Sequence, residues 1–305
     1  MIRSQRMIAV YLVASLIVLC GHNVCAQEAQ SSRPQRVISL APSVTETLFA
    51  LGFGNRLMGV TTSCDYPAEA LKLPKIGGFM SPSLEAIVAK RPDLVIGVSS
   101  ATDPVKAREL ERLGLKVTLI SLASLSDILS SIKSIARLMG SPQDGEKLAN
   151  TIGAQVRDVK KSIELAPLRS VLFVVGIRPL VAVGGKNFID ELITLARGEN
   201  IGGSAAQPWL NLPEEYVVAK APQVIIEAGM GTEREQSDKR WGDLKSIPAV
   251  KERRIYSYPS DKILRPGPRF GEALAELAGL IHPECFANSS SNQRSAGSRC
   301  ASPKP

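Results

Sequence analysis

The chain has 305 residues, of which 44% are hydrophobic and 22% charged, so it is globular and long enough for two domains. Its formal net charge is +8, but five of the excess positive charges fall in two terminal segments that we expect outside the fold: Arg3, Arg6, Arg294, Arg299 and Lys304. The remaining excess of three charges does not favour nucleic-acid binding, and we predict no nucleic-acid partner.

Residues 1–26 are typical of a secretory signal peptide. Two arginines precede an apolar run over 8–19, and small residues stand at positions −3 and −1 of a cleavage site after Ala26. The apolar run is too short to span a bilayer comfortably. Cys20 follows it, as in a lipoprotein signal, but Leu19 stands where a small residue is wanted. We therefore predict a cleaved periplasmic protein, with lipid anchoring at Cys20 as the alternative.

Strands and helices alternate through the first half of the chain. Ser43 and Glu46 match a capping box, which predicts the start of a helix that ends near Leu51. Strict alternation predicts a parallel sheet covered by helices. The expected strands are 37–40, 57–61, 94–98 and 115–120, and the expected helices are 43–51, 81–90, 103–113 and 126–139.

Residues 141–166 are predicted to form one long linking helix. Pro142 stands at its first position, and Ser141 and Asp144 are placed to cap it. Apolar residues recur on one face, at Leu148, Ile152, Val156, Val159 and Ile163. At about 1.5 Å per residue this helix would span roughly 36 Å, which is close to the width of a small domain.

The second half of the chain repeats the first. Residues 79–96 align without a gap on 209–226, at a constant offset of 130. The expected strands are 171–175, 180–183, 224–227 and 254–257, and the expected helices are 187–196, 213–220 and 268–281. The fold class is therefore α/β: two Rossmann-like lobes, 33–140 and 167–286, joined by the single helix 141–166 with a ligand cleft between them. Residues 287–305 are Ser-rich and expected to be disordered.

The repeat places two pairs of residues at equivalent positions. Phe79 and Trp209 are expected in equivalent loops before helices, and such loops face the crevice where α/β proteins bind ligands. Glu85 and Glu215 follow six residues later, and a pseudo-twofold pair of carboxylates suits a partner that is itself twofold symmetric.

Histidine and cysteine limit the chemistry. His282 is the one histidine left after cleavage, which argues against multi-histidine metal sites, and we expect no metal site, no cofactor and no catalytic residue. Cys64, Cys285 and Cys300 remain in an oxidising compartment. Three pairings are open to them; a disulfide between Cys64 and Cys285 is one, and separate thiols are the alternative.

Several segments together resemble the periplasmic substrate-binding proteins of ABC importers for cobalamin and iron-siderophores, and most of all the cobalamin-binding branch. They are Arg36–Glu46, Gly59–Pro67, Ser83–Ile96, Gly198–Ile201 and Arg265–Arg269. The resemblance implies a monomer with no enzymatic activity that delivers a corrinoid (vitamin B12) to a permease dimer in the inner membrane. It implies that Phe79 and Trp209 hold the corrin between the lobes and that Glu85 and Glu215 dock on permease arginines.

The chain departs from that branch in ways that bear on the ligand. Ser63 stands where the best-known cobalamin binder has a tyrosine, and Lys262 and Ile263 replace an aromatic pair after Asp261. Lys262 and Arg265, together with Arg269, make this rim basic, which suits a carboxylate or catecholate ligand. The alternative ligand is therefore a ferric siderophore or haem-type iron chelate. We predict that Ser63, Asp261, Lys262 and Arg265 contact the ligand together with the two aromatics. An enzyme on the same fold is a third reading, for which we find no nucleophile or base.

The signal peptide generates a first prediction. Mass spectrometry of the protein isolated from the periplasm should give a mature N-terminus near Gln27, because the small residues lie before that position. A mature protein that begins with a lipid-modified Cys20 would contradict it.

Overall fold

The computed structural model describes residues 33–228, 240–258 and 261–286, with the backbone alone for Asp261. The predicted signal peptide, Cys300 and the predicted tail lie outside the described residues. Within the described ranges, none of the helices combines the length and the apolarity needed to cross a bilayer.

The first lobe contains an all-parallel, four-stranded sheet. Its strands lie in the order β2-β1-β3-β4, with β1 in contact with both β2 and β3. β3 is buried along its whole length, as expected for a parallel strand covered on both faces. The bounds are β1 Val37–Ser39, α2 Pro42–Ala50, β2 Leu57–Val60, α3 Leu84–Ala89, β3 Leu94–Val98, α4 Pro104–Arg112, β4 Val117–Ile120 and α5 Leu125–Met139. The predicted strands and helices of this half are confirmed.

The second lobe contains a six-stranded mixed sheet instead of the parallel sheet predicted. β6 runs antiparallel to both of its neighbours, β5 and β8. Only residues 177–180 join β5 to β6, and a parallel crossover would need a dozen residues or more. The bounds are β5 Arg169–Gly176, β6 Val181–Val183, α7 Phe188–Leu195, β7 Gly198–Asn200, β8 Trp209–Asn211, α8 Glu214–Lys220, β9 Val224–Glu227, α10 Pro248–Lys251, β10 Ile255–Ser257 and α11 Phe270–Ile281. α8 and β9 recur at the offset of 130 from α3 and β3.

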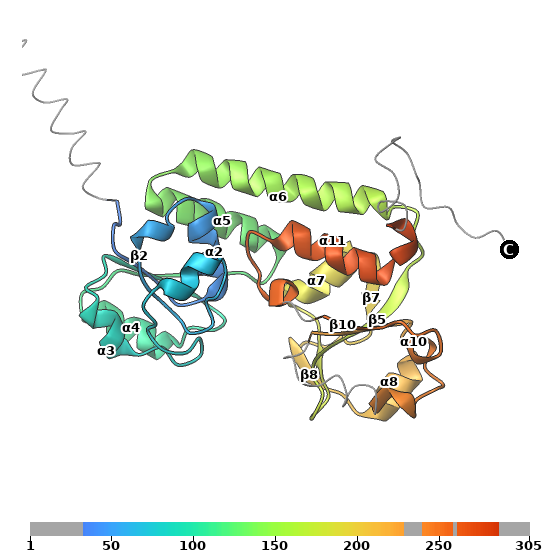
Figure 1. Cartoon of the computed structure of the whole chain (residues 1–305). Coiled ribbons are helices and arrows are strands. Elements are labelled where there is room, and N and C mark those ends of the chain that lie inside the picture. Colours follow the sequence, from blue (N-terminus) through green and yellow to red (C-terminus); the bar gives the residue numbers. More distant parts are fainter. Residues whose placement is uncertain (1–32, 229–239, 259–260, 287–305) are drawn as a thin grey trace, which may run out of the picture.

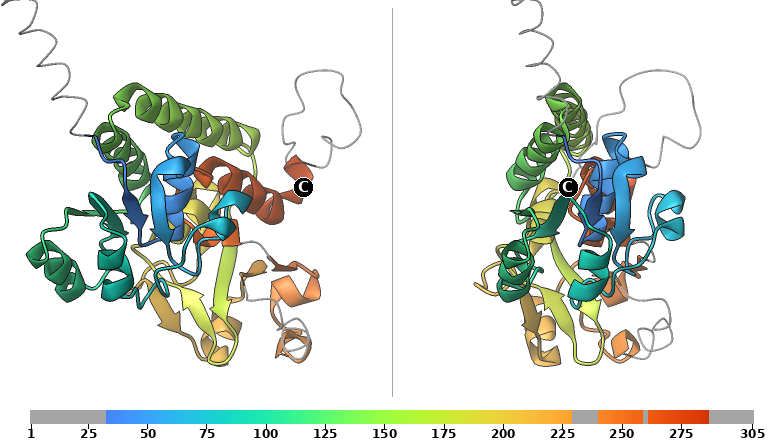
Figure 2. Two further views of the ribbon diagram at one scale, coloured as in Figure 1. Left: turned by 60° about the vertical axis from the view of Figure 1, so that its left-hand side comes forward. Right: turned by 90° about the vertical axis from the view of Figure 1, so that its left-hand side faces the viewer.

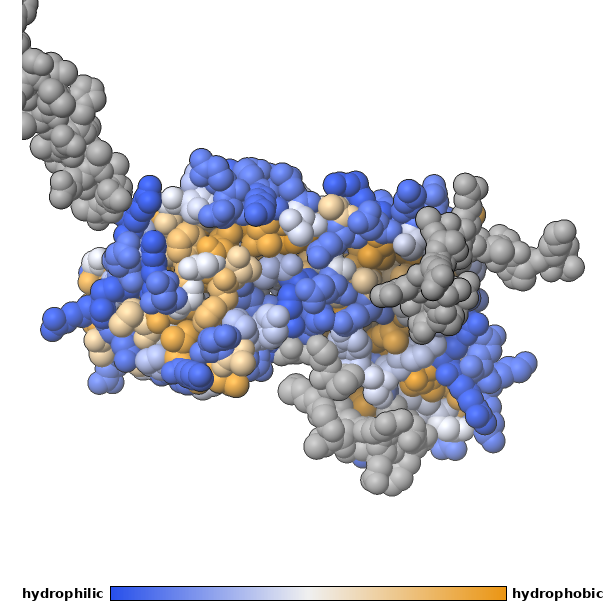
Figure 3. Space-filling model, turned by 45° about the horizontal axis from the view of Figure 1, so that its top comes forward, coloured by the Kyte–Doolittle hydropathy of each residue, from blue (hydrophilic) through white to orange (hydrophobic). Residues whose placement is uncertain are grey.

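One long helix, α6 (Pro142–Ser162), joins the lobes. It packs against α5 of the first lobe and α11 of the second, and Figures 1 and 2 show it lying along the same side of both. The apolar stripe predicted from the sequence is confirmed, since Ile152, Val156, Val159 and Ile163 are all buried. They belong to one hydrophobic cluster that continues from the first sheet into the second. In Figure 3 the edge where α6 lies is hydrophilic, and hydrophobic residues show beneath it.

The structure differs from the predicted N-terminal capping of two helices, α6 and α2. The Ser141 hydroxyl donates to the carboxylate of Asp144 and makes no hydrogen bond with the helix backbone. The capping box at Ser43 and Glu46 was wrong, because α2 begins one residue earlier, at Pro42, and no side chain caps it. The Glu46 side chain makes no capping hydrogen bond and lies instead between the two lobes.

The carboxylate of Glu46 joins the two lobes. Its side chain is 1% exposed, and Arg269 donates to both oxygens, from Nε at 2.7 Å and from Nη2 at 2.6 Å. Arg265 Nη1 lies 3.3 Å from the same carboxylate and donates to Asp65 Oδ1 at 2.6 Å. The hydrogen bond from Arg265 lowers the pKa of Asp65. Although burial disfavours the charged guanidinium of Arg269, the hydrogen bonds and charge of Glu46 raise its pKa. We call these four residues the interlobe cluster.

Of the cysteine pairings left open by the sequence, the structure excludes a disulfide between Cys64 and Cys285. Cys64 is a buried free thiol in the first lobe, with Sγ 3.1 Å from Thr61 Oγ1 and 3.2 Å from Thr45 Oγ1. Cys285 lies in the short turn after α11 in the second lobe and is disulfide-bonded. The distance between two cysteines cannot be inferred from the fact that both can be oxidised. It is set by the packing of the lobes.

His282 follows the last residue of α11 in the second lobe. It is fully buried, with Nε2 3.0 Å from the carbonyl of Ala196 and Nδ1 3.5 Å from Arg169. Burial, followed by the positive charge of Arg169, lowers the pKa of His282 below its ordinary value, and the charge of Glu284 opposes this in part. The imidazole is therefore a neutral structural group at physiological pH.

The interlobe cluster generates a stability prediction. Glu46→Ala removes the buried carboxylate shared by two largely buried guanidinium groups, of which Arg265 keeps Asp65 as a partner. We expect a loss of about 3–5 kcal/mol in the free energy of unfolding, measured by urea titration. The control is Glu272→Ala, because Glu272 forms an ion pair with Lys262 at 3.2 Å but is half exposed; its loss should stay below about 1 kcal/mol. Equal losses in the two variants would contradict the role of Glu46.

A pH dependence follows from His282. Its folded pKa lies below the unfolded value of 6.5, so the unfolded chain binds more protons between the two values. This contribution to stability is complete above about pH 6.5 and is lost as the pH falls toward the folded pKa. Thermal unfolding at about pH 7.5 and pH 5 should show a larger decrease in Tm for the wild type than for His282→Gln. Parallel decreases would show that His282 does not contribute.

Candidate functional site

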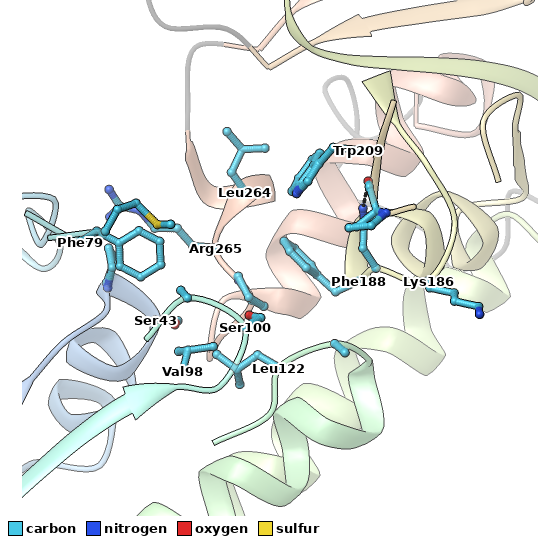
Figure 4. Close-up of a pocket in the computed structure, with 17 residues that line it drawn as sticks. Ser43, Phe79, Val98, Ser100, Leu122, Lys186, Phe188, Trp209, Leu264 and Arg265 are labelled. Atoms are coloured by element: carbon cyan, nitrogen blue, oxygen red, sulfur yellow. Dashed lines mark hydrogen bonds between the residues drawn. The ribbon is translucent and has the colours of Figure 1, made fainter. Parts of the chain in front are cut away.

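A cavity of about 470 Å³ lies between the two lobes, within the range of small-molecule sites. Both lobes contribute to it, and Figure 4 shows Phe79 on one side and Phe188 and Trp209 on the other. The lining consists of Pro42, Ser43, Phe79, Met80, Val98, Ser100, Ala101, Leu122, Ala123, Lys186, Asn187, Phe188, Pro208, Trp209, Leu264, Arg265 and Pro266. Most of these side chains are apolar, and no carboxylate is among these lining residues.

Phe79 reaches the cavity from a loop of the first lobe that its glycines shape. Gly77 has φ +106°, and a Cβ there would lie 2.8 Å from the backbone nitrogen of Ser83, so only glycine fits this turn. A bridge between Gly77 and Pro82 closes the loop. Phe79 is partly buried against the central hydrophobic cluster, so one side of the ring is packed and the other faces the cavity.

Trp209 reaches the cavity from the opposite lobe. The prediction of a loop position was wrong, because Trp209 begins β8 and pairs with Val183 of β6. Gly184 permits this close approach, since a Cβ there would lie 2.0 Å from the carbonyl oxygen of Gln207. Asn187 caps α7 through Oδ1 and donates from Nδ2 to the carbonyl of Pro208 at 2.8 Å. Trp209 is 47% exposed at the start of this strand.

Several lining residues were missed by the sequence analysis. Val98 ends β3 and Leu122 follows β4, at the carboxyl edge of the first sheet, where α/β proteins commonly bind ligands. Phe188 is the first residue of α7, and Leu264 ends the short helical turn Asp261–Leu264. The predicted strand ends indicated the region in which Val98 and Leu122 lie. No sequence pattern distinguished Phe188 or Leu264 from core residues.

The basic residues predicted to contact the ligand are already paired. Arg265 lines the cavity but donates to Asp65 and Glu46 and, from Nη2, to the carbonyl of Ser63 at 3.2 Å. Lys262 Nζ lies 2.6 Å from Glu276 and 3.2 Å from Glu272, on α11. Neither Ser63 nor Lys262 lines the cavity. The side chain of Asp261 lies outside the described residues.

Lys186 is the other cationic residue of the lining. It has φ +57° and is exposed, and in Figure 4 its side chain points away from the cavity. Among the described residues, no group of three or more His, Cys, Asp or Glu side chains is arranged to hold a metal ion. The cavity is therefore an apolar space with hydroxyl and amide groups at its edge.

Glu85 and Glu215 lie away from the cavity. Each stands in the first turn of its helix, α3 or α8, and each is exposed. Within the described part of the chain neither glutamate has an ion-pair partner; Arg240 pairs with Glu214 instead, at 3.1 Å. Figure 1 shows both helices on the side of the molecule away from α6.

Comparisons with known proteins agree with this architecture. The family described as "Periplasmic binding protein" matches residues 37–262. A "Vitamin B12-binding protein" of Vibrio campbellii is 30% identical over 244 residues, which cover 80% of this chain and 88% of the relative.

Among solved structures, the periplasmic vitamin B12 binding protein BtuF of Vibrio cholerae aligns with a TM-score of 0.74. It is 24% identical, and the alignment covers 82% of this chain and 97% of that one. The periplasmic heme-binding protein RhuT of Roseiflexus sp. RS-1 aligns with a TM-score of 0.72 at 28% identity, over 82% and 99% of the two chains. With a matching family over most of its length, a shared two-lobed fold and a cavity between the lobes, the chain belongs to the periplasmic binding protein family.

Proposed function

We propose that this protein binds a corrinoid in the cavity between its lobes and delivers it to an ABC permease in the inner membrane. Membership of the family places the protein outside the cytoplasm. Support for the ligand comes from the relative in Vibrio campbellii, which is named for vitamin B12, and from the chemistry of the cavity. Phe79, Phe188 and Trp209 offer broad faces to a ligand that is large, flat and mostly apolar at its centre.

The observation that carries the choice of ligand is the pairing of the basic residues. A ferric siderophore with carboxylate or catecholate charge would need cations that turn toward it. Arg265 and Arg269 are held by Glu46 and Asp65, and Lys262 is held by two glutamates of α11. A cavity near which three cations are paired, and whose remaining lining cation, Lys186, points away, favours a ligand without strong negative charge. Hydroxyl and amide groups at its edge suit the peripheral amides of a corrinoid.

A haem-type chelate is the second alternative, and the structural relative from Roseiflexus is named for heme. Haem iron needs an axial ligand from His, Cys, Met or Tyr. Among the described residues that line the cavity, the one side chain of these types is Met80, which is 71% exposed. The cobalt of a corrinoid arrives already coordinated, so the scarcity of axial ligands favours the corrinoid over haem.

Delivery requires a surface for the permease. We propose that Glu85 and Glu215 supply it, because they are exposed, related by the internal repeat and placed on one side of the molecule. We propose further that the mature protein is a periplasmic monomer with no catalytic role. The residues that line the cavity between Phe79 and Trp209 include no histidine, cysteine or carboxylate that could act as a catalytic base.

Calorimetric titration with cyanocobalamin tests the ligand. We expect binding at micromolar or lower Kd in the wild type and a loss of roughly tenfold or more in Trp209→Ala, because an aromatic face contributes on the order of 1–3 kcal/mol. Lys262→Gln is the matched control and should bind as the wild type does, since Lys262 is engaged by α11.

The same titration distinguishes the alternatives. A ferric siderophore that binds while cyanocobalamin does not, with the affinity lost in Lys262→Gln, would transfer the assignment to a siderophore. Haemin binding with a new absorption band that disappears in Met80→Ala would transfer it to haem.

A further inference from the structure

Five described residues other than glycine have a backbone φ in the left-handed region, which residues with a Cβ rarely adopt. Four of them stand one or two residues after the last residue of a helix, where a left-handed residue is a common way for a helix to end. They are Arg91, Arg197, Ala221 and Arg253, after α3, α7, α8 and α10. Lys186, with φ +57°, is the exception, because it stands before the first residue of α7.

The local structure does not favour a lysine at this position. Glycine or asparagine adopts a left-handed φ with less strain. The helix dipole also disfavours a positive charge directly before the N-cap, Asn187, whereas it favours the three arginines at helix C-termini. Lys186 is exposed, and no ion pair within the described residues offsets these costs. Two local penalties at one residue indicate a role other than local stability.

The backbone that carries Lys186 is fixed at the rim of the cavity. A Cβ at Gly184 or Gly185 would collide with a carbonyl oxygen of the segment 203–207, so the chain before Lys186 packs closely on that segment. On the other side of Lys186, Asn187 caps α7 through its side chain. The ammonium group can therefore move only through its own four-carbon stem, which is flexible.

Lys186 differs from the other cation of the lining in having no carboxylate partner among the described residues. Arg265, the other one, is held by Glu46 and Asp65. Lys186 contributes to the lining although its side chain points away from the cavity in Figure 4. Rotation of the stem brings the ammonium to the edge of the cavity. A ligand there meets one positive charge that is not already neutralised.

We propose that Lys186 binds the phosphate of the nucleotide loop of a corrinoid and thereby selects complete corrinoids over cobinamides, which lack this loop; the inference rests on the proposed function. The phosphodiester is the one negative charge of the loop, and it lies at the periphery of the molecule, away from the apolar faces of the ring. One cation on a flexible stem at the edge of the cavity matches one peripheral negative charge. It does not match the several charges of a catecholate siderophore.

Calorimetric titration of the mature protein with cyanocobalamin and with dicyanocobinamide tests the proposal. We expect the wild type to bind cyanocobalamin more tightly. Lys186→Asn removes the charge and suits the left-handed φ. Its affinity for cyanocobalamin should fall about threefold to tenfold, the range for one charge-assisted contact of an exposed lysine. Its affinity for dicyanocobinamide should equal that of the wild type.

Two variants control for charge. Lys186→Arg keeps the positive charge and should retain the affinity for cyanocobalamin to within about twofold. Lys161→Gln changes the net charge by the same amount as Lys186→Asn, at an exposed lysine of α6, and should bind both corrinoids as the wild type does. Raising the salt concentration from about 50 to 300 mM should weaken cyanocobalamin binding less in Lys186→Asn than in the wild type, because salt screens the contact that this variant lacks.

Thermal unfolding separates recognition of the ligand from a structural role of the lysine. The Tm of Lys186→Asn without ligand should not lie below that of the wild type, because asparagine tolerates the left-handed φ and the charge beside the N-terminus of α7 is gone. A lower Tm together with the loss of affinity would show that Lys186 acts through the turn, and would overturn the proposal.

The remaining outcomes distinguish this inference from the proposed function. Wild-type affinity for cyanocobalamin in Lys186→Asn, or a loss in Lys186→Arg equal to that in Lys186→Asn, would overturn the role of the charge. Equal losses for the two corrinoids would overturn recognition of the phosphate. Inorganic phosphate that binds at micromolar Kd and is lost in Lys186→Asn would assign the lysine to a free anion instead. Failure of the wild type to bind either corrinoid would overturn the proposed function and this inference with it.

Discussion

A buried carboxylate from one lobe, held by two cations from the other, determines how the halves of this protein meet. Glu46 is almost inaccessible to water, and Arg269 satisfies both of its oxygens. Arg265 extends the network to Asp65, whose side chain is half exposed. Removing Glu46 leaves the two arginines without the buried carboxylate that they share. The relative position of the lobes is therefore specified by electrostatics as well as by the single connecting helix.

The same cluster affects the character of the cavity. Arg265 lies in the lining, yet its hydrogen bonds go to residues of the interlobe cluster and to a backbone carbonyl. A residue that would otherwise attract anions thus serves the contact between lobes. What remains for a ligand is a set of aromatic and aliphatic surfaces, each fixed by its own backbone geometry. Gly77 permits the turn that presents Phe79, and Gly184 permits the strand pairing that presents Trp209.

The internal repeat relates the two residues proposed to bind the ligand and, separately, the two residues proposed to contact the permease. The offset of 130 relates Phe79 to Trp209 and, six residues later, Glu85 to Glu215. The first pair faces inward to the cavity, and the second pair faces outward on α3 and α8. The repeat is imperfect around Trp209, where antiparallel β6 and β8 replace the loop of the first lobe. The helices that follow keep the same exposure pattern, so the outer surface is more symmetric than the cavity.

Three features could be predicted from the amino-acid sequence: the alternation of strands and helices, the long linking helix with its apolar stripe, and the repeat. These features depend on hydrophobic periodicity and on Pro and Gly residues that end helices and strands. Both signals involve residues that are close together in the sequence. The ion-pair partners of Glu46, Arg265 and Lys262, by contrast, could not be predicted from the sequence. A capping box and a basic rim were reasonable interpretations of local spacing, but the partners of these charges lie in another element or lobe, more than 200 residues away for Glu46. The pairing of Cys64 stayed open at the level of the sequence for the same reason: spacing in sequence does not fix the distance between groups that packing brings together or holds apart.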